Sequence, residues 1–124
     1  MSVNKVILVG NVGRNPEIRY IESRPYATFS LATAERVAGG REITEWHQIV
    51  MWDAAAETAA RYITKGTKLY VEGRLRTRTW QDFNAIKRTV TEIYVDSFDI
   101  LARPQARADA QTQTPPQTPP QTPQ

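Results

Sequence analysis

The sequence predicts an all-β domain that contains one short helix and is followed by a tail outside the domain. Stretches rich in β-branched and aromatic residues, several of them alternating apolar with polar, fill most of residues 1–102. One Ala-rich stretch, residues 53–66, has helical character. In residues 103–124, Pro, Gln, Thr and Ala dominate. Such a segment cannot bury enough apolar area to offset its chain entropy, so we predict a domain over 1–102 and a disordered tail over 103–124.

Three strands are predicted before the helix. The first is the apolar run NKVILVGNV, ending near Gly10; after a turn at Asn15-Pro16, EIRYI continues or restarts strand pairing. The second, YATFSLATA, alternates regularly, which indicates a half-buried strand. Gly39-Gly40 supplies a permissive connection to the third strand, ITEWHQIVMW.

The helix and two long strands complete the domain. Asp53 is placed to cap the helix, and Gly66 is expected to end it in a left-handed conformation. KLYVEGRLRTRTW and RTVTEIYVDSFDIL form the last strands, separated by the turn-prone QDFNAIK. Three strands, a helix and two strands is the order of a five-stranded OB-fold barrel with its helix between strands 3 and 4. Small sandwiches and SH3-like barrels share many of these features.

Composition excludes several kinds of site. The chain has no cysteine, so it has no disulfide and no Cys-containing zinc site, and its only histidine, His47, cannot form a multi-histidine site. We expect no metal and no cofactor. An enzyme such as a nuclease would need clustered carboxylates, whereas here they are scattered singly, so no catalysis is expected: Glu17, Glu22, Glu35, Glu45, Glu57 and Asp82. The sequence shows no secretory signal and no apolar run of membrane-spanning length, so we expect a cytoplasmic protein.

The stretch from 68 to 80 carries an unusual strand face. Its odd-numbered residues are mostly apolar and predict the core side: Leu69, Val71, Gly73, Leu75 and Thr77. Its even-numbered residues include two aromatic rings and four cations: Lys68, Tyr70, Glu72, Arg74, Arg76, Arg78 and Trp80. Isolated charges normally form only a solvated face, but like charges about 7 Å apart repel each other, and a polyanion would relieve this repulsion.

Two further tryptophans extend this pattern. Trp46 and Trp52 are six residues apart in the third strand and share a face unless a bulge intervenes. A single Trp taken alone is as readily a core residue. Single-stranded nucleic acid offers phosphates to cations and unstacked bases to rings, with about 1–3 kcal/mol for each stacked base, and its recognition is largely tolerant of sequence. The net charge of +3 is compatible with such a partner.

Several stretches, in this order, resemble the bacterial single-stranded DNA-binding proteins of replication: VNKVILVGNVGRNPEIRY, TFSLATAE, TEWHQIVMW, YITKGTKLYVEGRLRTRTW and TEIYVDSF. The resemblance implies an OB-fold that assembles as a homotetramer and binds and protects single-stranded DNA in the cytoplasm, on the nucleoid, during replication, recombination and repair. It assigns base stacking to Trp46, Trp52 and Trp80. It assigns phosphate contacts to Lys5, Arg76 and Arg78, with Arg19 and Lys65 as weaker candidates, and links His47 to subunit contacts. From the strand face we add Arg74 and Tyr70.

The sequence departs from this family in two places. Many relatives carry another Trp shortly after the LAT segment, where this chain has Val37. The family tail normally finishes in a short acidic and hydrophobic tip that recruits replication and repair proteins, whereas this chain ends QTPPQTPPQTPQ, with no acidic residue after Asp109. Recruitment through such a tip is therefore doubtful, and both a natural and a shortened C-terminus agree with the sequence.

Other functions remain open at this point. An OB module that binds single-stranded RNA or acts in replication restart would use the same face, because discrimination rests on 2′-hydroxyl contacts. A structural oligomer would instead bury the aromatic residues in subunit interfaces.

Overall fold

The structure, a computed structural model, describes residues 1–104 and contains six strands, one α-helix and one short 3-10 turn at Ala38–Gly40. The predicted tail lies outside the described residues, apart from Arg103 and Pro104. The elements are β1 (Val6–Val12), β2 (Glu17–Ile21), β3 (Arg24–Arg36), β4 (Glu42–Trp52), α1 (Asp53–Tyr62), β5 (Lys68–Gln81) and β6 (Lys87–Ala102).

The strands form one sheet that closes into a barrel. Its order is β1-β5-β6-β4-β3-β2, and β1 also pairs with β3, through Asn11 opposite Ala32 and Val12 opposite Leu31. The pairing of β4 with β6 is parallel, and the others are antiparallel. Because β2 follows β1 after a break of four residues, the two together serve as the first strand of the predicted five. The OB-fold prediction is confirmed.

Closure brings two backbones close together at Gly10. A Cβ atom at this position would lie 2.2 Å from the carbonyl oxygen of Ala32 on β3. No side chain fits there without moving one of the two strands. The glycine therefore lets the barrel close.

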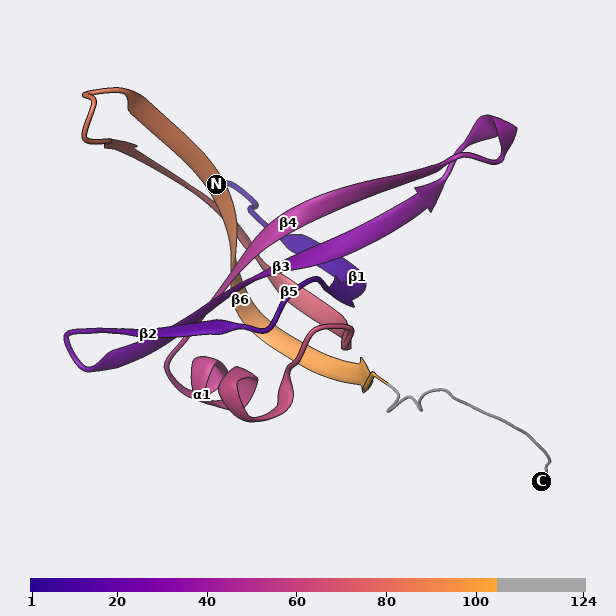
Figure 1. Cartoon of the computed structure of the whole chain (residues 1–124), viewed down its shortest axis with the longest axis horizontal. Coiled ribbons are helices and arrows are strands. Elements are labelled where there is room, and N and C mark those ends of the chain that lie inside the picture. The colour runs from indigo at the N-terminus through magenta and orange to yellow at the C-terminus, as the bar shows by residue number, and fades with distance from the viewer. Residues whose placement is uncertain (105–124) are drawn as a thin grey trace.

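Alternate residues of the strands fill the barrel. The largest side chains without exposed surface all point inward: Phe29, Leu31, Ile49, Met51, Leu69 and Val71. Helix α1 packs on β3 and β4 and contributes the buried Ala56 and Ala59 to the same core (Figure 1).

Two ribbons extend from the barrel in different directions (Figure 1). The β3–β4 ribbon comprises residues 33–45, and the β5–β6 ribbon comprises residues 75–91. Threonine pairs join the strands of the second ribbon: Thr77 to Thr91 at 3.1 Å and Thr79 to Thr89 at 3.3 Å. Leu75, predicted to face the core, is 48% exposed because β5 has already left the barrel there.

The ends of the helix differ from the prediction. Asp53 is its first residue, with a positive φ of 57°, and no side chain caps the helix by a hydrogen bond. The Asp53 carboxylate binds Arg24 instead. The helix ends at Tyr62, before Gly66, whose φ of 93° shapes the loop that follows. There the Gly66 N–H donates to the Val12 carbonyl at 2.8 Å, which ties the loop to β1.

Candidate nucleic-acid interface

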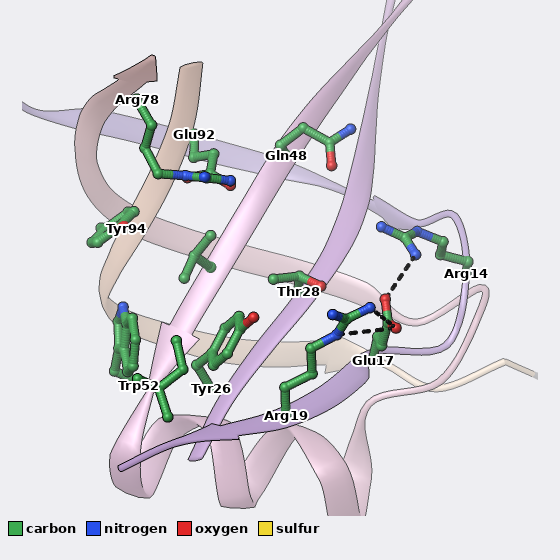
Figure 2. A pocket seen from close by; sticks show the side chains of 12 residues that line it. Arg14, Glu17, Arg19, Tyr26, Thr28, Gln48, Trp52, Arg78, Glu92 and Tyr94 are labelled. Atoms are coloured by element: carbon green, nitrogen blue, oxygen red, sulfur yellow. Dashed lines mark hydrogen bonds and ion pairs between the residues drawn. The ribbon is translucent and has the colours of Figure 1, made fainter. Parts of the chain in front are cut away.

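The outer face of the sheet carries an open groove of about 360 Å³ (Figure 2). Five strands and the break between β1 and β2 contribute its lining: Arg14, Glu17, Arg19, Ile21, Tyr26, Thr28, Gln48, Val50, Trp52, Arg78, Glu92 and Tyr94. Figure 2 shows Arg78 and Glu92 at one end, Arg14, Glu17 and Arg19 at the other, and Thr28 and Gln48 between them. We call this site the groove.

Strand register explains why these side chains share one face. On β3 and β4, Tyr26 lies opposite Trp52 and Thr28 opposite Val50, with no bulge along the pairing. The alternation therefore continues without a break from Trp46 to Trp52, and the prediction that they share a face is confirmed. Val50 is only 4% exposed and forms the apolar floor of the groove.

The aromatic wall of the groove is built around Trp52. Its indole stacks on the ring of Tyr26, with centroids 5.0 Å apart and an angle of 28° between the planes. The Arg24 guanidinium lies 4.7 Å from the same indole and also binds the Asp53 carboxylate at 2.8 Å. This hydrogen bond lowers the pKa of Asp53 below its usual range. Trp52 is half-buried, and two neighbours already contact its ring.

Trp46 and Trp80 lie outside the groove and are more exposed. Trp46, 59% exposed, covers Gly13, where a Cβ atom would lie 2.3 Å from the indole. Trp80, 44% exposed, belongs to the β5–β6 ribbon, and the Arg78 guanidinium lies 5.1 Å from its ring centroid. The prediction that strand alternation places Trp80 outside the core is confirmed.

The arginines of β5 are not the uncompensated row that the sequence suggested. Arg78 donates to Glu92 through two nitrogens, at 2.9 and 3.2 Å, and this raises the pKa of the guanidinium. Arg74 donates to Asp96 at 3.0 Å. Within residues 1–104, Arg76 has no ion pair, and its guanidinium lies 5.3 Å from the Tyr94 ring. The expected repulsion was wrong for two of the three, because β6 supplies carboxylates from the neighbouring strand.

The structure places the remaining predicted residues around the barrel. Arg19 lines the groove and donates to Glu17 at 2.6 Å, which lowers the pKa of that carboxyl. Lys5 binds Glu72 at 2.9 Å, and Tyr70 lies opposite Val9 on the paired strands; neither lines the groove. Lys65 donates its backbone N–H to Asn15 at 2.8 Å, also outside it. His47 is half-buried, with Nε2 2.9 Å from the Thr33 hydroxyl.

The groove thus unites Trp52, Arg19 and Arg78 from the predicted set. Sequence reasoning missed several of its other residues, chiefly Tyr26, Tyr94, Arg14 and Glu92. Tyr26 had a usable signal, since it falls on the polar side of the alternating second strand. Arg14 had none, because it enters the groove from an irregular break.

Residues 1–104 contain neither a cluster of metal-ligating side chains nor a membrane-spanning helix. No group of three or more His, Cys, Asp or Glu side chains is arranged to hold a metal ion. No helix there is long and apolar enough to cross a membrane.

Comparisons with known proteins all indicate the same family. The pattern of the "Single-strand binding protein family" matches residues 3–101. A single-stranded DNA-binding protein of Bacteroides thetaiotaomicron is 47% identical over 109 residues, which cover 82% of this chain and 68% of that protein. Among solved structures, the Plasmodium falciparum SSB in complex with single-stranded DNA is similar, with a TM-score of 0.71 and 37% identity over 80% of this chain and 93% of that chain.

Proposed function

The chain belongs to the single-strand binding protein family, and we propose that its groove face binds and protects single-stranded DNA without sequence specificity. One observation carries the proposal. The face that holds the groove presents the rings of Trp52, Tyr26 and Tyr94 beside guanidinium groups, with two exposed indoles beyond it. Unpaired DNA needs rings for its bases and cations for its phosphates on one surface.

The proposed path of the strand follows β4 and β5. Trp46 and Trp52 are separated by about 20 Å along β4, from six residues at about 3.3 Å each. Bases stack on Trp46 and Trp80, and at Trp52 they meet an indole already paired with Tyr26. Arg76 supplies a cation without a carboxylate partner among residues 1–104. Lys5 and Arg74 extend the path toward β1 and the start of β5.

The proposed role is non-catalytic and lies in DNA replication, recombination and repair, in the cytoplasm on the nucleoid. The protein would coat exposed single strands there. No step in this role changes a covalent bond.

We also propose that the protein acts as a homotetramer. Ile7 and Val9 on β1 are 57% and 47% exposed, although both are large and apolar. Burial against other subunits would remove this surface from water. His47 is proposed to lie near such a contact. Sedimentation equilibrium tests the proposal, and a monomer at micromolar concentration would refute it.

The main experiment is titration of intrinsic tryptophan fluorescence with poly-dT, because stacking on indoles quenches their emission. Trp46→Ala and Trp80→Ala should each weaken binding by about 1–3 kcal/mol and leave the melting temperature nearly unchanged. Tyr62→Ala, which removes an exposed ring from α1, is the matched control and should bind like the wild type. Unquenched emission, or normal binding by both Trp variants, would refute the proposal.

Salt dependence tests the phosphate contacts separately. Arg76→Gln should reduce the slope of log affinity against log salt by about 0.7, the value for one neutralised phosphate on a single strand. An unchanged slope would remove Arg76 from the path. A matching RNA as competitor of poly-dT tests the RNA alternative, and equal competition would favour it.

A further inference from the structure

All three cations that line the groove are held by carboxylates within it. At one end, Arg78 binds Glu92 through its Nε and Nη2 atoms. At the other end, Arg19 binds Glu17, and the Nη1 atom of Arg14 lies 4.0 Å from the same carboxylate. The groove therefore contains three guanidinium groups and two carboxylates. A phosphate that enters it meets cations that are already partly neutralised.

Glu92 cannot easily release its partner. The residue is 8% exposed, and burial of a carboxylate without a partner carries a large desolvation penalty. If Arg78 turned away to meet a phosphate, it would leave this charge alone at the wall of the groove. Arg78 has five N–H donors, and two are used, so three remain for a phosphate while the pair as a whole has no net charge. Long-range attraction of phosphate to this end of the groove is correspondingly weak.

Glu17 holds its partners in a more open position. Its side chain is 47% exposed, and the hydrogen bond from Arg19 keeps its pKa low, so the carboxylate is charged at neutral pH. Like Glu92, this carboxylate accepts two hydrogen bonds from its arginine, here from the Nε and Nη2 atoms of Arg19 at 3.2 and 2.6 Å. Both ends of the groove therefore pair an arginine with a glutamate, within β2 at one end and between β5 and β6 at the other.

We propose that Glu17 and Glu92 are built-in competitors of the phosphate backbone, which keep the affinity of the groove below the value that its arginines alone would give. This inference rests on the proposed function, single-stranded DNA binding at the groove. Its consequence is easier release: a strand held against internal carboxylates leaves faster than one held by free cations.

The test removes each negative charge and keeps the shape. Glu92→Gln and Glu17→Gln should each bind poly-dT about fivefold more tightly at 0.1 M NaCl and about twofold at 0.4 M, because one additional phosphate contact steepens the salt slope by about 0.7. The matched control is Glu57→Gln, which makes the same change in net charge on α1, away from the groove. It should change affinity by less than about twofold.

A double-mutant cycle separates competition from a role in folding. Arg78→Gln alone should bind more weakly than loss of one cation predicts, since it leaves Glu92 unpaired beside the strand. The Arg78→Gln/Glu92→Gln protein, whose net charge equals that of the wild type, should recover most of this loss. If Glu92→Gln lowers the melting temperature, the result for Glu17→Gln decides the test, because the Glu17 side chain is exposed and its loss should not affect folding.

The outcomes distinguish the two proposals. Tighter binding by the groove variants, above the control, supports the competitor role. If the wild type binds poly-dT and both variants match Glu57→Gln, this inference fails and the proposed function stands. If the wild type does not bind poly-dT, both fail.

Discussion

The β5–β6 ribbon continues two of the strands of the barrel, yet the barrel and the ribbon differ in what holds them together. In the barrel part of β5, Leu69 and Val71 have no exposed surface, and Tyr70 between them lies on the opposite face of the strand and is half-buried. Beyond Gly73 the alternation continues in the sequence, but every residue from Arg74 to Gln81 is exposed. The ribbon is held by its backbone ladder, the threonine pairs and ion pairs. Alternation therefore fixes which face a residue takes, while the closure of the sheet decides whether that face is covered.

Two leucines of the same parity on β5 give the largest predicted contrast. Leu69→Ala should lower the free energy of unfolding by about 2–5 kcal/mol, because it leaves a cavity in the core. Leu75→Ala, in the ribbon, should change it by about 0.5 kcal/mol or less. Urea unfolding followed by circular dichroism measures both. Equal losses would mean that the ribbon has a covered apolar side.

Two glycines, one in the barrel and one at a ribbon tip, extend this comparison to the backbone. Gly10→Ala places a methyl group against the Ala32 carbonyl and should destabilise the barrel by about 3 kcal/mol. Gly39→Ala, at the tip of the β3–β4 ribbon, meets nothing within 4 Å and should cost only about 1 kcal/mol for its positive φ of 85°. Thermal unfolding of the two variants measures the difference. A smaller loss for Gly10→Ala than for Gly39→Ala would contradict the close approach of β1 and β3.

Two tryptophans distinguish stability from binding. Trp52→Ala removes the stack on Tyr26 and a partner of Arg24, so it should reduce the free energy of unfolding by about 1–3 kcal/mol. Trp80→Ala should leave folding within about 0.5 kcal/mol of the wild type, since its ring lies in the ribbon. Paired melting and poly-dT titrations measure this. Early melting of Trp80→Ala alone would assign that ring to the folded core.

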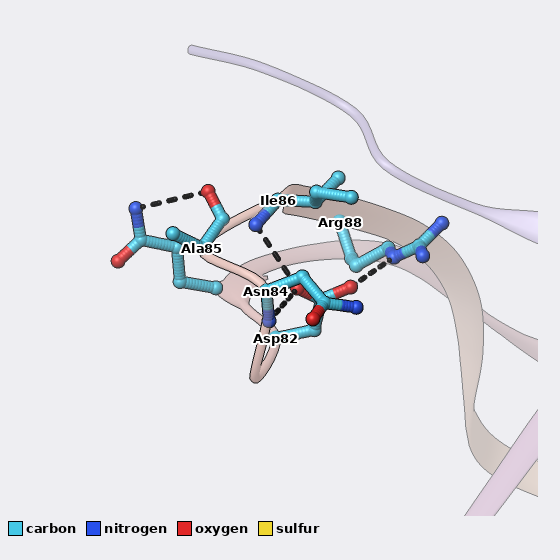
Figure 3. Close-up of polar contacts among 6 residues, drawn as sticks. Asp82, Asn84, Ala85, Ile86 and Arg88 are labelled. Atoms are coloured by element: carbon cyan, nitrogen blue, oxygen red, sulfur yellow. Dashed lines mark hydrogen bonds and ion pairs between the residues drawn. The ribbon is translucent and has the colours of Figure 1, made fainter.

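The smallest predicted effect concerns the tip of the β5–β6 ribbon. The Asp82 carboxylate accepts from the N–H groups of Ile86 and Asn84 and from Arg88 (Figure 3). The hydrogen bond from Ile86 is the main cause of its lowered pKa. A lowered folded pKa stabilises the turn above the unfolded value of about 3.9, and this contribution is lost as the pH falls through the folded pKa.

Amide chemical shifts and hydrogen exchange at Asn84 and Ile86 measure this loosening. Both should change below about pH 4, while barrel amides such as that of Val71 keep their protection. Asp82→Ala removes the titrating group and serves as the control. If the signals of the Asn84 and Ile86 amides in the wild type do not change with pH, Asp82 does not stabilise this turn.

The sequence predicted the strands, the helix and the shared face of Trp46 and Trp52 because these depend on local alternation. It did not predict that Arg78 binds Glu92, since this contact joins residues 14 positions apart through the register of a hairpin. Asp53 looked like a helix cap from its position, but Arg24, 29 residues away, competes for its carboxylate. The misjudged features depend on which strands become neighbours, which alternation alone does not specify.

The four residues between β1 and β2 have a consequence for insertions and deletions. Within this break, Gly13 leaves room for an indole, Arg14 reaches the groove, and Asn15 accepts a hydrogen bond from the loop after α1. An added residue would displace all three contacts together. At residues 39–40, by contrast, a Cβ atom added at either glycine would meet no other atom within 4 Å, so this tip should tolerate a change in length. Natural length variation should therefore gather at the tip of the β3–β4 ribbon and spare the break in the first strand.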